Sequence, residues 1–600
     1  MPPALPGRNV ERRRACGAHD GMKPASRSRT WMEEKEMRRS FRTLATFLAG
    51  VAIVAGACSP ASSSAPASEA PSSAPTIAPS VEPTAVAAGG GEFSMAVEGD
   101  LQTLDPAICY DTNCAPLMHM LYDSLIAYAP NSEQLQPGLA EAMPDVSADG
   151  LTFTFKLRQG VMFTKGDGTP LREVTADDVV WSLNRILDPG LTPTPSPVGP
   201  AFFAQIVGSA AVLDGSSPSA SGLKALDAHT VEISIAKPNR AFLNVLAMSF
   251  GSVLPKELAG MDTTAFSASP VGTGAFYLKS YVKGDKAILQ RNTGYWREGY
   301  PKVDTVEYRL VVDANTQLQQ VEAGQLDLMG NDIPAGEFTA TTTDPAYKDQ
   351  VLRSALVATN FLVLDSSGST PMSNVKVRQA IAMAIDKDNI LKVNNGRGVK
   401  ANCIFPPQFA AFDASCDPYP RDVEGAKALM KEAGFEAGFS TTMYTDTQAL
   451  SKSISESIIA DLAEIGITAE LVQQDFDVLI GTITTPHSAP ATFIGWYQDF
   501  PDPSDFYDPI FSCAADVPGA ASFGWYCNPA ADTLADQARA EPDTAKRIDL
   551  YRQLQAMVMA DVPSVPLFNP DQALLVSKRI VGSPFHPAYF FDLDEIDVTE

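Results

Sequence analysis

Basic residues are scarce in this sequence. Its 600 residues include 45 Lys and Arg against 71 Asp and Glu, and the formal net charge is −26. Proteins bind nucleic acids and anionic membrane surfaces through clustered positive charge, so this balance argues against both as charge-driven partners. The excess of acid favours cationic solutes, although solubility accounts for most of these charges.

Histidine is also rare, and the pattern of a metal site is missing. The five histidines are scattered, as His119 and His229 illustrate, and no cysteine pair has the two-residue spacing of a zinc knuckle. The motifs HExxH and GxSxG are absent, which excludes the common zinc-protease and serine-hydrolase patterns. We expect no metal and no cofactor.

Two Ser-x-x-Lys patterns leave a serine hydrolase as a minor alternative. They are Ser280 to Lys283 and Ser373 to Lys376, and neither is accompanied by the KTG or SDN motif of that enzyme class. Asp499 and Asp502 are paired carboxylates, but the prolines around them indicate a turn rather than two facing catalytic groups. We therefore predict that the protein is not an enzyme.

Long hydrophobic runs are missing as well. The apolar run at residues 44–57 is shorter than the about 20 residues of a membrane-spanning helix. Arg38, Arg39 and Arg42 precede it, which is the pattern of a signal peptide at 1–57, with an upstream extension before a start at Met37. The pair Arg38-Arg39 leaves the Sec and twin-arginine export routes both open.

Small residues and a cysteine end this run. The sequence Ala55-Gly56-Ala57-Cys58 resembles the lipobox of bacterial lipoproteins, which implies a lipid on Cys58. Residues 58–91 are rich in Ser, Ala and Pro and cannot bury a core, so they are expected to form a flexible tether. The folded part is then held by its lipid at the extracytoplasmic face of the cell membrane, in the periplasm or at the cell surface.

Six cysteines remain after Cys58. An even number in an exported chain indicates disulfides, and local pairing is the simplest of the possible connectivities. The three local pairs are Cys109 with Cys114, Cys403 with Cys416, and Cys513 with Cys527.

Strand and helix patterns alternate from residue 92 onward. Residues 151–158 and 230–236 alternate apolar and polar side chains, as half-buried strands do, and Thr175 is placed to cap a helix over 179–187. Further helices are predicted at 375–393, 423–433 and 453–466, with a strand at 467–472. This indicates an α/β fold with mixed sheets, and some 500 residues require at least two lobes.

A series of motifs resembles one known family. Residues 147–163 (SADGLTFTFKLRQGVMF) and 175–183 (TADDVVWSL) are similar to the signature region of the family 5 extracellular solute-binding proteins, the peptide and nickel receptors of ABC importers. Further blocks in the same order are LDP at 104–106, PVGTGAF at 270–276, RNTGYW at 291–296, EAGQLD at 322–327, VRQAIAMAID at 377–386 and AKALMKEAG at 426–434. Most of these blocks, including Trp181, Tyr295 and Trp296, are interpreted as structural.

The resemblance implies a two-lobed periplasmic-binding-protein fold of class II, with the ligand cleft between the lobes. Lobe I would comprise 92–354 and 570–600, with an extra subdomain near 126–259, and lobe II would comprise 355–569. The implied function is capture of a peptide or peptide-like ligand for delivery to ABC permease subunits, by a protein expected to be a monomer. A receptor for an amine-bearing compound or metal chelate stays open as an alternative.

The stretch GWYQDFPDP at 495–503 carries the predicted ligand site. In peptide-binding members of the family an acidic residue three positions after the tryptophan receives the ligand's ammonium, which here implies Asp499. Gly495, Trp496 and Tyr497 are the other predicted ligand-binding residues, whereas Asp502 is assigned to the turn. Dipeptide-binding relatives carry an arginine for the ligand's carboxylate, but the corresponding stretch YTDTQ at 444–448 has no cation unless Lys452 or another base reaches inward.

Overall fold

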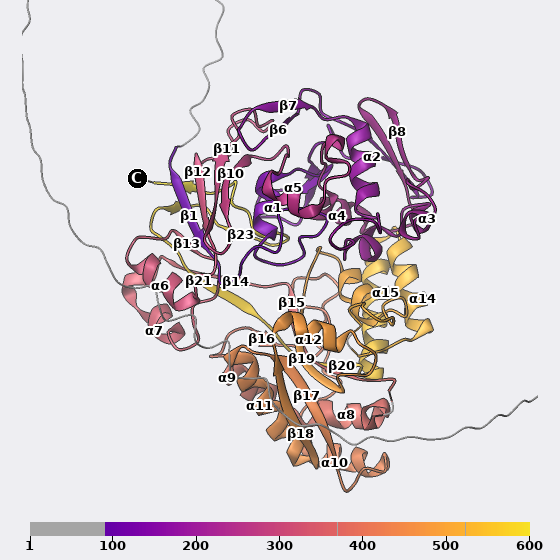
Figure 1. Ribbon diagram of the computed structural model, residues 1–600. Helices are drawn as coiled ribbons and strands as arrows, with labels where there is room; N and C mark the ends of the chain where they lie inside the picture. The colour runs from indigo at the N-terminus through magenta and orange to yellow at the C-terminus, as the bar shows by residue number, and fades with distance from the viewer. Residues whose placement is uncertain (1–89, 369, 523, 600) are drawn as a thin grey trace, which may run out of the picture. The chain divides into compact units, whose positions relative to one another are not determined.

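The computed structural model describes residues 90–368, 370–522 and 524–599. The predicted signal peptide at 1–57, the lipid site Cys58 and nearly all of the tether lie outside these residues. The described part belongs to one compact unit, Pro83–Glu600, in which helices and several sheets alternate (Figure 1), so the predicted α/β class with mixed sheets is confirmed. Within this part no helix combines the length and the apolar character needed to cross a membrane.

A five-stranded sheet organises the first part of the chain, which we call lobe I. Strand β1 is parallel to both of its neighbours, whereas the two pairings at the other end of the sheet are antiparallel. In order across the sheet the strands are β10 (Phe276–Val282), β11 (Lys286–Arg291), β12 (Thr305–Arg309), β1 (Glu92–Ala96) and β13 (Leu328–Met329). Apolar side chains of β1 and β12 are fully buried in one core cluster.

A smaller four-stranded sheet lies in the range predicted as the extra subdomain of lobe I, near 126–259. Its strands are β4 (Asp145–Val146), β5 (Thr152–Lys156), β9 (Thr230–Ser234) and β8 (Leu223–Asp227). The strands predicted at 151–158 and 230–236 are therefore present as β5 and β9. Helix α2 (Ala176–Arg185) starts as predicted at Thr175, which forms a capping box with Asp178.

A six-stranded sheet organises the second part, which we call lobe II. Its order is β16 (Val399–Lys400), β20 (Ser564–Asn569), β15 (Ala358–Leu364), β19 (Ala491–Tyr497), β17 (Phe439–Asp446) and β18 (Ile467–Gln474). Every residue of β15 is buried, and successive apolar side chains enter two different core clusters. Both faces of the sheet are thus covered by other elements (Figure 1).

Two helices of lobe II largely match their predicted positions, α10 (Val423–Glu432) and α11 (Ala449–Glu464). Helices α14 (Pro529–Ala540) and α15 (Thr544–Asp561) were not predicted. The prediction of one continuous helix at 375–393 is wrong, because the structure has two helices there, α8 (Val375–Ala384) and α9 (Lys387–Val393). The break occurs because Asp386 caps α9 and its main-chain N–H donates to Asp461 on α11.

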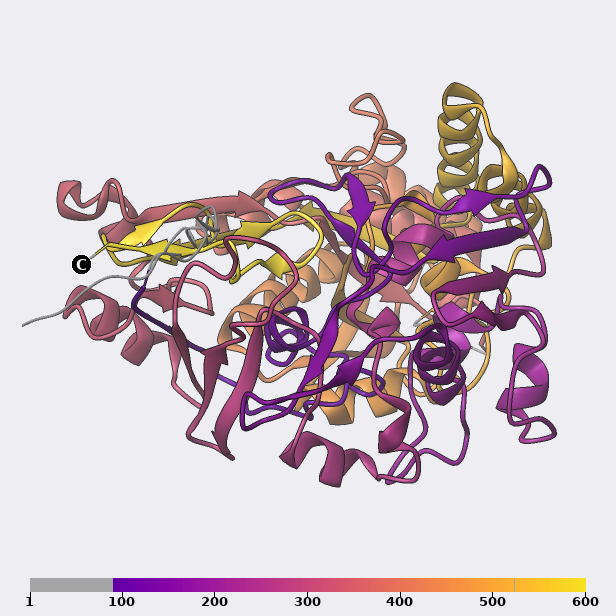
Figure 2. The same ribbon diagram turned by 90° about the horizontal axis from the view of Figure 1, so that it is seen from above.

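The chain returns to lobe I after β20. Strand β21 (Asp571–Leu575) pairs antiparallel with β14 (Val351–Ala355), and Ala573, Leu574 and Leu575 enter the core cluster of lobe I. Figure 2 shows these yellow C-terminal strands beside the part of the chain that leaves lobe I. The lobe boundaries at 354/355 and 569/570 stay a prediction.

Three disulfides join the local cysteine pairs, Cys109–Cys114, Cys403–Cys416 and Cys513–Cys527.

Tyr295 and Trp296 of the RNTGYW block have a structural role, since both donate side-chain hydrogen bonds to Asp123, at 3.2 and 3.1 Å.

Candidate functional site

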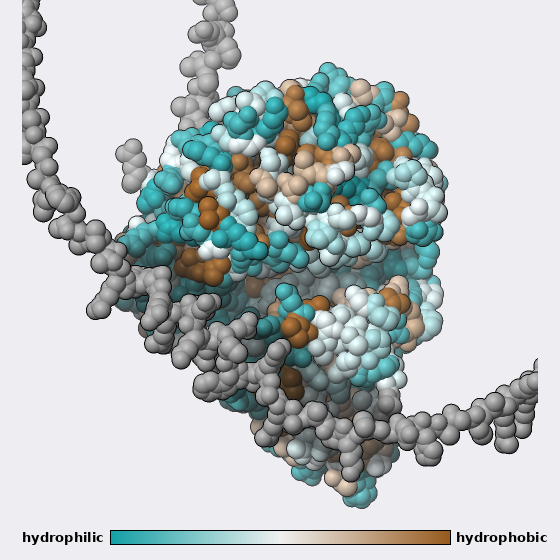
Figure 3. Space-filling view, in the orientation of Figure 1, coloured by the Kyte–Doolittle hydropathy of each residue, from teal (hydrophilic) through white to brown (hydrophobic). Residues whose placement is uncertain are grey.

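The predicted site lies at the end of β19 in lobe II. Strands β17 and β18 run parallel to β19, so the C-terminal ends of all three meet at one edge of the sheet. A hollow runs between lobe I and lobe II in the space-filling view, and apolar atoms lie along its lower rim (Figure 3). The residues that follow these strands are therefore positioned to contact a solute in this hollow.

Gly495, Trp496 and Tyr497 are the last residues of β19. Gly495 lies opposite Asn360 of β15, and a Cβ atom there would lie 2.7 Å from the Asn360 Oδ1, so any other residue would displace the Asn360 side chain. Trp496 is half-buried against the core of lobe II, and the Tyr497 side chain is 42% exposed. Pairing of β19 with β17 ends at Thr492. Residues 493–497 consequently have no partner on that edge among the described strands.

Asp499 is half-buried in the loop after β19. Its Oδ2 accepts a hydrogen bond of 3.0 Å from the hydroxyl of Tyr110, a residue of lobe I. Burial raises the pKa of Asp499 to about 7, and the hydrogen bond from Tyr110 opposes this rise. Asp499 is thus a carboxylate in contact with both lobes, and its burial favours the protonated form.

Asp505 is a second carboxylate beneath the site, which sequence reasoning missed. It belongs to the short 3-10 helix η6 (Pro503–Phe506) and is fully buried. Its Oδ2 accepts hydrogen bonds from the main-chain N–H of Asp499, at 3.0 Å, and from the indole N–H of Trp496, at 3.2 Å. Burial and then the nearby charge of Asp499 raise the pKa of Asp505 well above its usual range. No sequence pattern distinguishes Asp505 from other acidic residues in loops.

Asp502 has the structural role predicted for it. Its side chain caps η6 by accepting hydrogen bonds from the Ser504 N–H and hydroxyl, at 2.9 and 2.7 Å. Its other oxygen pairs with the Arg547 guanidinium of α15 at 2.6 Å. Asp502 therefore fixes the turn that carries Asp499, while its own charge is already neutralised.

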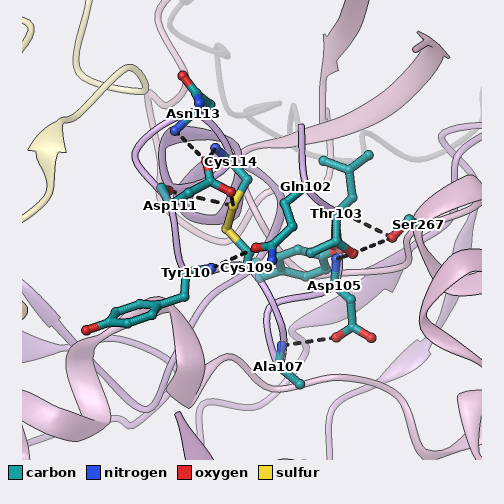
Figure 4. Close-up of a disulfide and its surroundings, with 12 residues drawn as sticks. Gln102, Thr103, Asp105, Ala107, Cys109, Tyr110, Asp111, Asn113, Cys114 and Ser267 are labelled. Atoms are coloured by element: carbon teal, nitrogen blue, oxygen red, sulfur yellow. Dashed lines mark hydrogen bonds between the residues drawn. A yellow bond between two sulfur atoms is a disulfide. The ribbon is translucent and has the colours of Figure 1, made fainter. Parts of the chain in front are cut away.

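Lobe I contributes Tyr110 from a loop closed by the Cys109–Cys114 disulfide. Figure 4 shows the tyrosine ring extending away from the disulfide, and the Tyr110 N–H faces the Gln102 side chain. The ring makes an edge contact with Phe250, with centroids 5.6 Å apart, and is 43% exposed. No sequence motif indicated that Tyr110 belongs to the site.

Acidic and basic side chains both lie near Tyr497. Loss of water around the hydroxyl, then the charges of Asp332 and Asp446, raise the pKa of Tyr497 to about 12, and the charge of Arg397 opposes this rise. Arg397 is buried and pairs with Asp332 at 3.2 Å. Lys452, considered above as a cation for the ligand, instead pairs with Glu456 of its own helix at 2.7 Å. Asp446, which belongs to the stretch 444–448 where the resemblance implied a cation, is thus an acid close to Tyr497.

Within the described ranges, no three His, Cys, Asp or Glu side chains converge closely enough to hold a metal ion. The predicted site residues come together with Asp505 and Tyr110, and the arrangement suits a cation: a carboxylate that becomes shielded from water binds an ammonium group more strongly.

The chain is similar to known proteins over most of its length. The model of the bacterial extracellular solute-binding proteins, family 5 Middle, matches residues 134–517. The chain is 30% identical over 492 residues to the dipeptide-binding protein of Escherichia coli strain K12, covering 80% of this chain and 88% of that protein. It is also 30% identical over 486 residues to heme-binding protein A of Haemophilus influenzae, covering 78% and 85%.

A solved structure shows the same fold. The periplasmic binding protein DppA from Helicobacter pylori, in complex with the peptide STSA, superimposes with a TM-score of 0.74 at 26% identity. The match covers 85% of this chain and 99% of that one. The predicted periplasmic-binding-protein fold is therefore confirmed.

Proposed function

This chain belongs to the bacterial extracellular solute-binding proteins of family 5, and we propose that it captures a peptide or peptide-like ligand and delivers it to an ABC importer. The observation that supports this most is the position of Asp499, which follows the open end of β19 and contacts the opposite lobe through Tyr110. In this proposal Asp499 receives the ligand's ammonium group.

Strand β19 supports an extended ligand. Beyond Thr492 its edge toward β17 lacks a strand partner in the described part of the chain, so main-chain groups near Gly495 and Tyr497 are available to a peptide backbone. Trp496 and Tyr497 offer flat apolar surface for ligand side chains. Closure of the lobes then stabilises the complex through the ligand's higher affinity for the closed form.

The membrane-anchored arrangement is part of the same proposal. Cys58 carries the lipid, residues 58–91 form the tether, and the permease subunits of the importer are the protein partner. The family is extracellular and its named relatives are binding proteins, which supports an extracytoplasmic protein that binds its ligand without chemical change. The monomeric state is part of the proposal.

A receptor for an amine-bearing compound that is not a peptide is the second candidate. It is favoured by Asp446, an acid at the place expected to hold a cation for the ligand's carboxylate. Arg397 lies nearby, but Asp332 already neutralises it. A ligand without a free carboxylate therefore suits this side of the site better than a free dipeptide does.

Mass spectrometry of ligands retained by the purified protein tests the proposal. We expect peptides with a free amino terminus among the ligands that co-purify or are retained from a mixture of di- to pentapeptides. Retention of amines without a peptide bond would favour the second candidate. Hydrolysis of any bound peptide during incubation would show that the protein is an enzyme.

A further inference from the structure

The loop that carries Tyr110 is fixed at both ends. Before it, the main-chain N–H of Cys109 donates to the Asp105 carbonyl at 2.9 Å, and the Asp105 carboxylate forms a buried ion pair with Arg185. After it, Cys114 begins helix α1 (Ala115–Leu121). The Cys109–Cys114 disulfide closes the loop between these anchors, and both cysteines are buried (Figure 4).

The interior of the loop is ordered by Asp111. Its carboxylate accepts hydrogen bonds from the N–H groups of Asn113, at 2.7 Å, and Cys114, at 3.0 Å. Tyr110 therefore extends from a short, closed and internally bonded segment. Because the backbone is held, the hydroxyl reaches Asp499 at a smaller cost in conformational entropy than a tyrosine on an open loop would require.

The Tyr110 hydroxyl leaves room for an ammonium group on Asp499. A carboxylate offers about four lone-pair positions, and a tyrosine hydroxyl that donates one hydrogen bond can still accept another. The Tyr110 hydroxyl donates its hydrogen bond to Asp499 Oδ2. An ammonium group beside this pair can donate to Asp499 and to the Tyr110 oxygen together, and so bridge the two lobes.

We propose that Tyr110 is a specificity-determining residue for the amine end of the ligand, and that the Cys109–Cys114 disulfide positions it for this role. This inference rests on the proposed function and extends it to lobe I. It assigns the disulfide a part in ligand selection in addition to fold stability.

The test uses the mature chain and the peptide that binds best from the mixture described above, with a free and with an acetylated amino terminus. By calorimetry, Tyr110→Phe should bind the free peptide about two- to tenfold more weakly, the effect of losing one hydrogen bond. The acetylated peptide should bind both proteins equally. Cys109→Ser with Cys114→Ser should show the same loss, and adding Tyr110→Phe to it should cause no further loss.

Cys403→Ser with Cys416→Ser is the matched control, because it also opens a local disulfide but leaves the loop that carries Tyr110 closed. It should lower the melting temperature and leave peptide affinity unchanged. If Tyr110→Phe and the parent protein bound the free peptide equally well, the inference about Tyr110 would be wrong while the proposed function would stand. This outcome does not depend on whether the cysteine variants fold. If the parent protein bound no peptide, the proposed function would fail and the role of Tyr110 with it.

Discussion

The hydroxyl of Tyr110 lies 3.0 Å from the carboxylate of Asp499, although 389 residues separate them in the chain. This hydrogen bond joins a disulfide-closed loop of lobe I to the turn after β19 in lobe II. The proposed anchor for the ligand is therefore also a contact between the lobes, so ligand binding and lobe closure involve the same carboxylate.

Ligand affinity should depend on pH with a maximum between about pH 7 and 8. Asp499 has a pKa of about 7, so below this pH it becomes protonated and loses its attraction for an ammonium group. Above about pH 8 the ligand's own amino group loses its proton, since the usual pKa of an α-amino group is about 7.7–8.0. Calorimetry from pH 5 to 9 checks this, and an affinity that stays flat from pH 5 to 7 would contradict it.

Asp499→Asn should make the ligand-free protein more stable at pH 8. The folded-state pKa of Asp499 is raised above its ordinary value of 3.8 to about 7, so the folded state binds this proton more tightly than the unfolded state does. The contribution of Asp499 to the free energy of unfolding therefore falls as the pH rises from about 4 to about 7.

The expected gain for the variant is about 2 kcal/mol at pH 8, because each pKa unit corresponds to about 1.4 kcal/mol and the site keeps some solvent. The two proteins should be equally stable near pH 4. Urea unfolding at both pH values measures the difference. A variant that is less stable at pH 8 would show that Asp499 makes a net stabilising contact.

Asp505 should matter for binding although it is fully buried. Asp505→Ala removes the acceptor for the Asp499 N–H and the Trp496 indole. Leaving two donors unpaired should cost about 2–4 kcal/mol of stability and weaken ligand binding at least tenfold. Asp505→Asn retains an oxygen acceptor, so its affinity should stay within about threefold of the parent protein. Equal affinity in the alanine variant and the parent would exclude this supporting role.

The buried ion pair that anchors the Tyr110 loop should contribute more to stability than an exposed ion pair does. The side chains of Arg185 and Asp105 are 7% and 0% exposed. Arg185→Ala leaves the Asp105 carboxylate buried without its partner, which should cost about 3–5 kcal/mol in urea unfolding. Lys431→Ala, which breaks an exposed pair with Glu436, should cost less than about 1 kcal/mol. Similar losses in both variants would contradict this difference.

Local structure could be predicted from the sequence where a short pattern decides it. The capping box at Thr175 and the alternation along β5 depend on neighbouring residues, and both are present. The break between α8 and α9 could not be seen, because the apolar pattern continues through it and the contact of Asp386 with Asp461 is tertiary.

The site was predictable only on the side of lobe II. Asp499, Trp496 and Tyr497 are adjacent in one motif, and Asp502 could be assigned to the turn from its prolines. Tyr110 is brought to Asp499 by the fold alone, and Asp505 differs from any other loop acid only through its burial. Sequence patterns carry no information about either property, since both depend on residues far away in the chain.

Calorimetry on Asp499→Asn tests the central claim most directly. The best-binding peptide, with a free and with an acetylated amino terminus, is titrated into the parent protein and the variant at pH 7.5. We expect the variant to bind the free peptide at least tenfold more weakly, in line with the about 2–5 kcal/mol lost when one partner of a buried charge pair is removed. The acetylated peptide should bind both proteins equally weakly. Unchanged affinity of the variant for the free peptide would remove Asp499 from the ligand site.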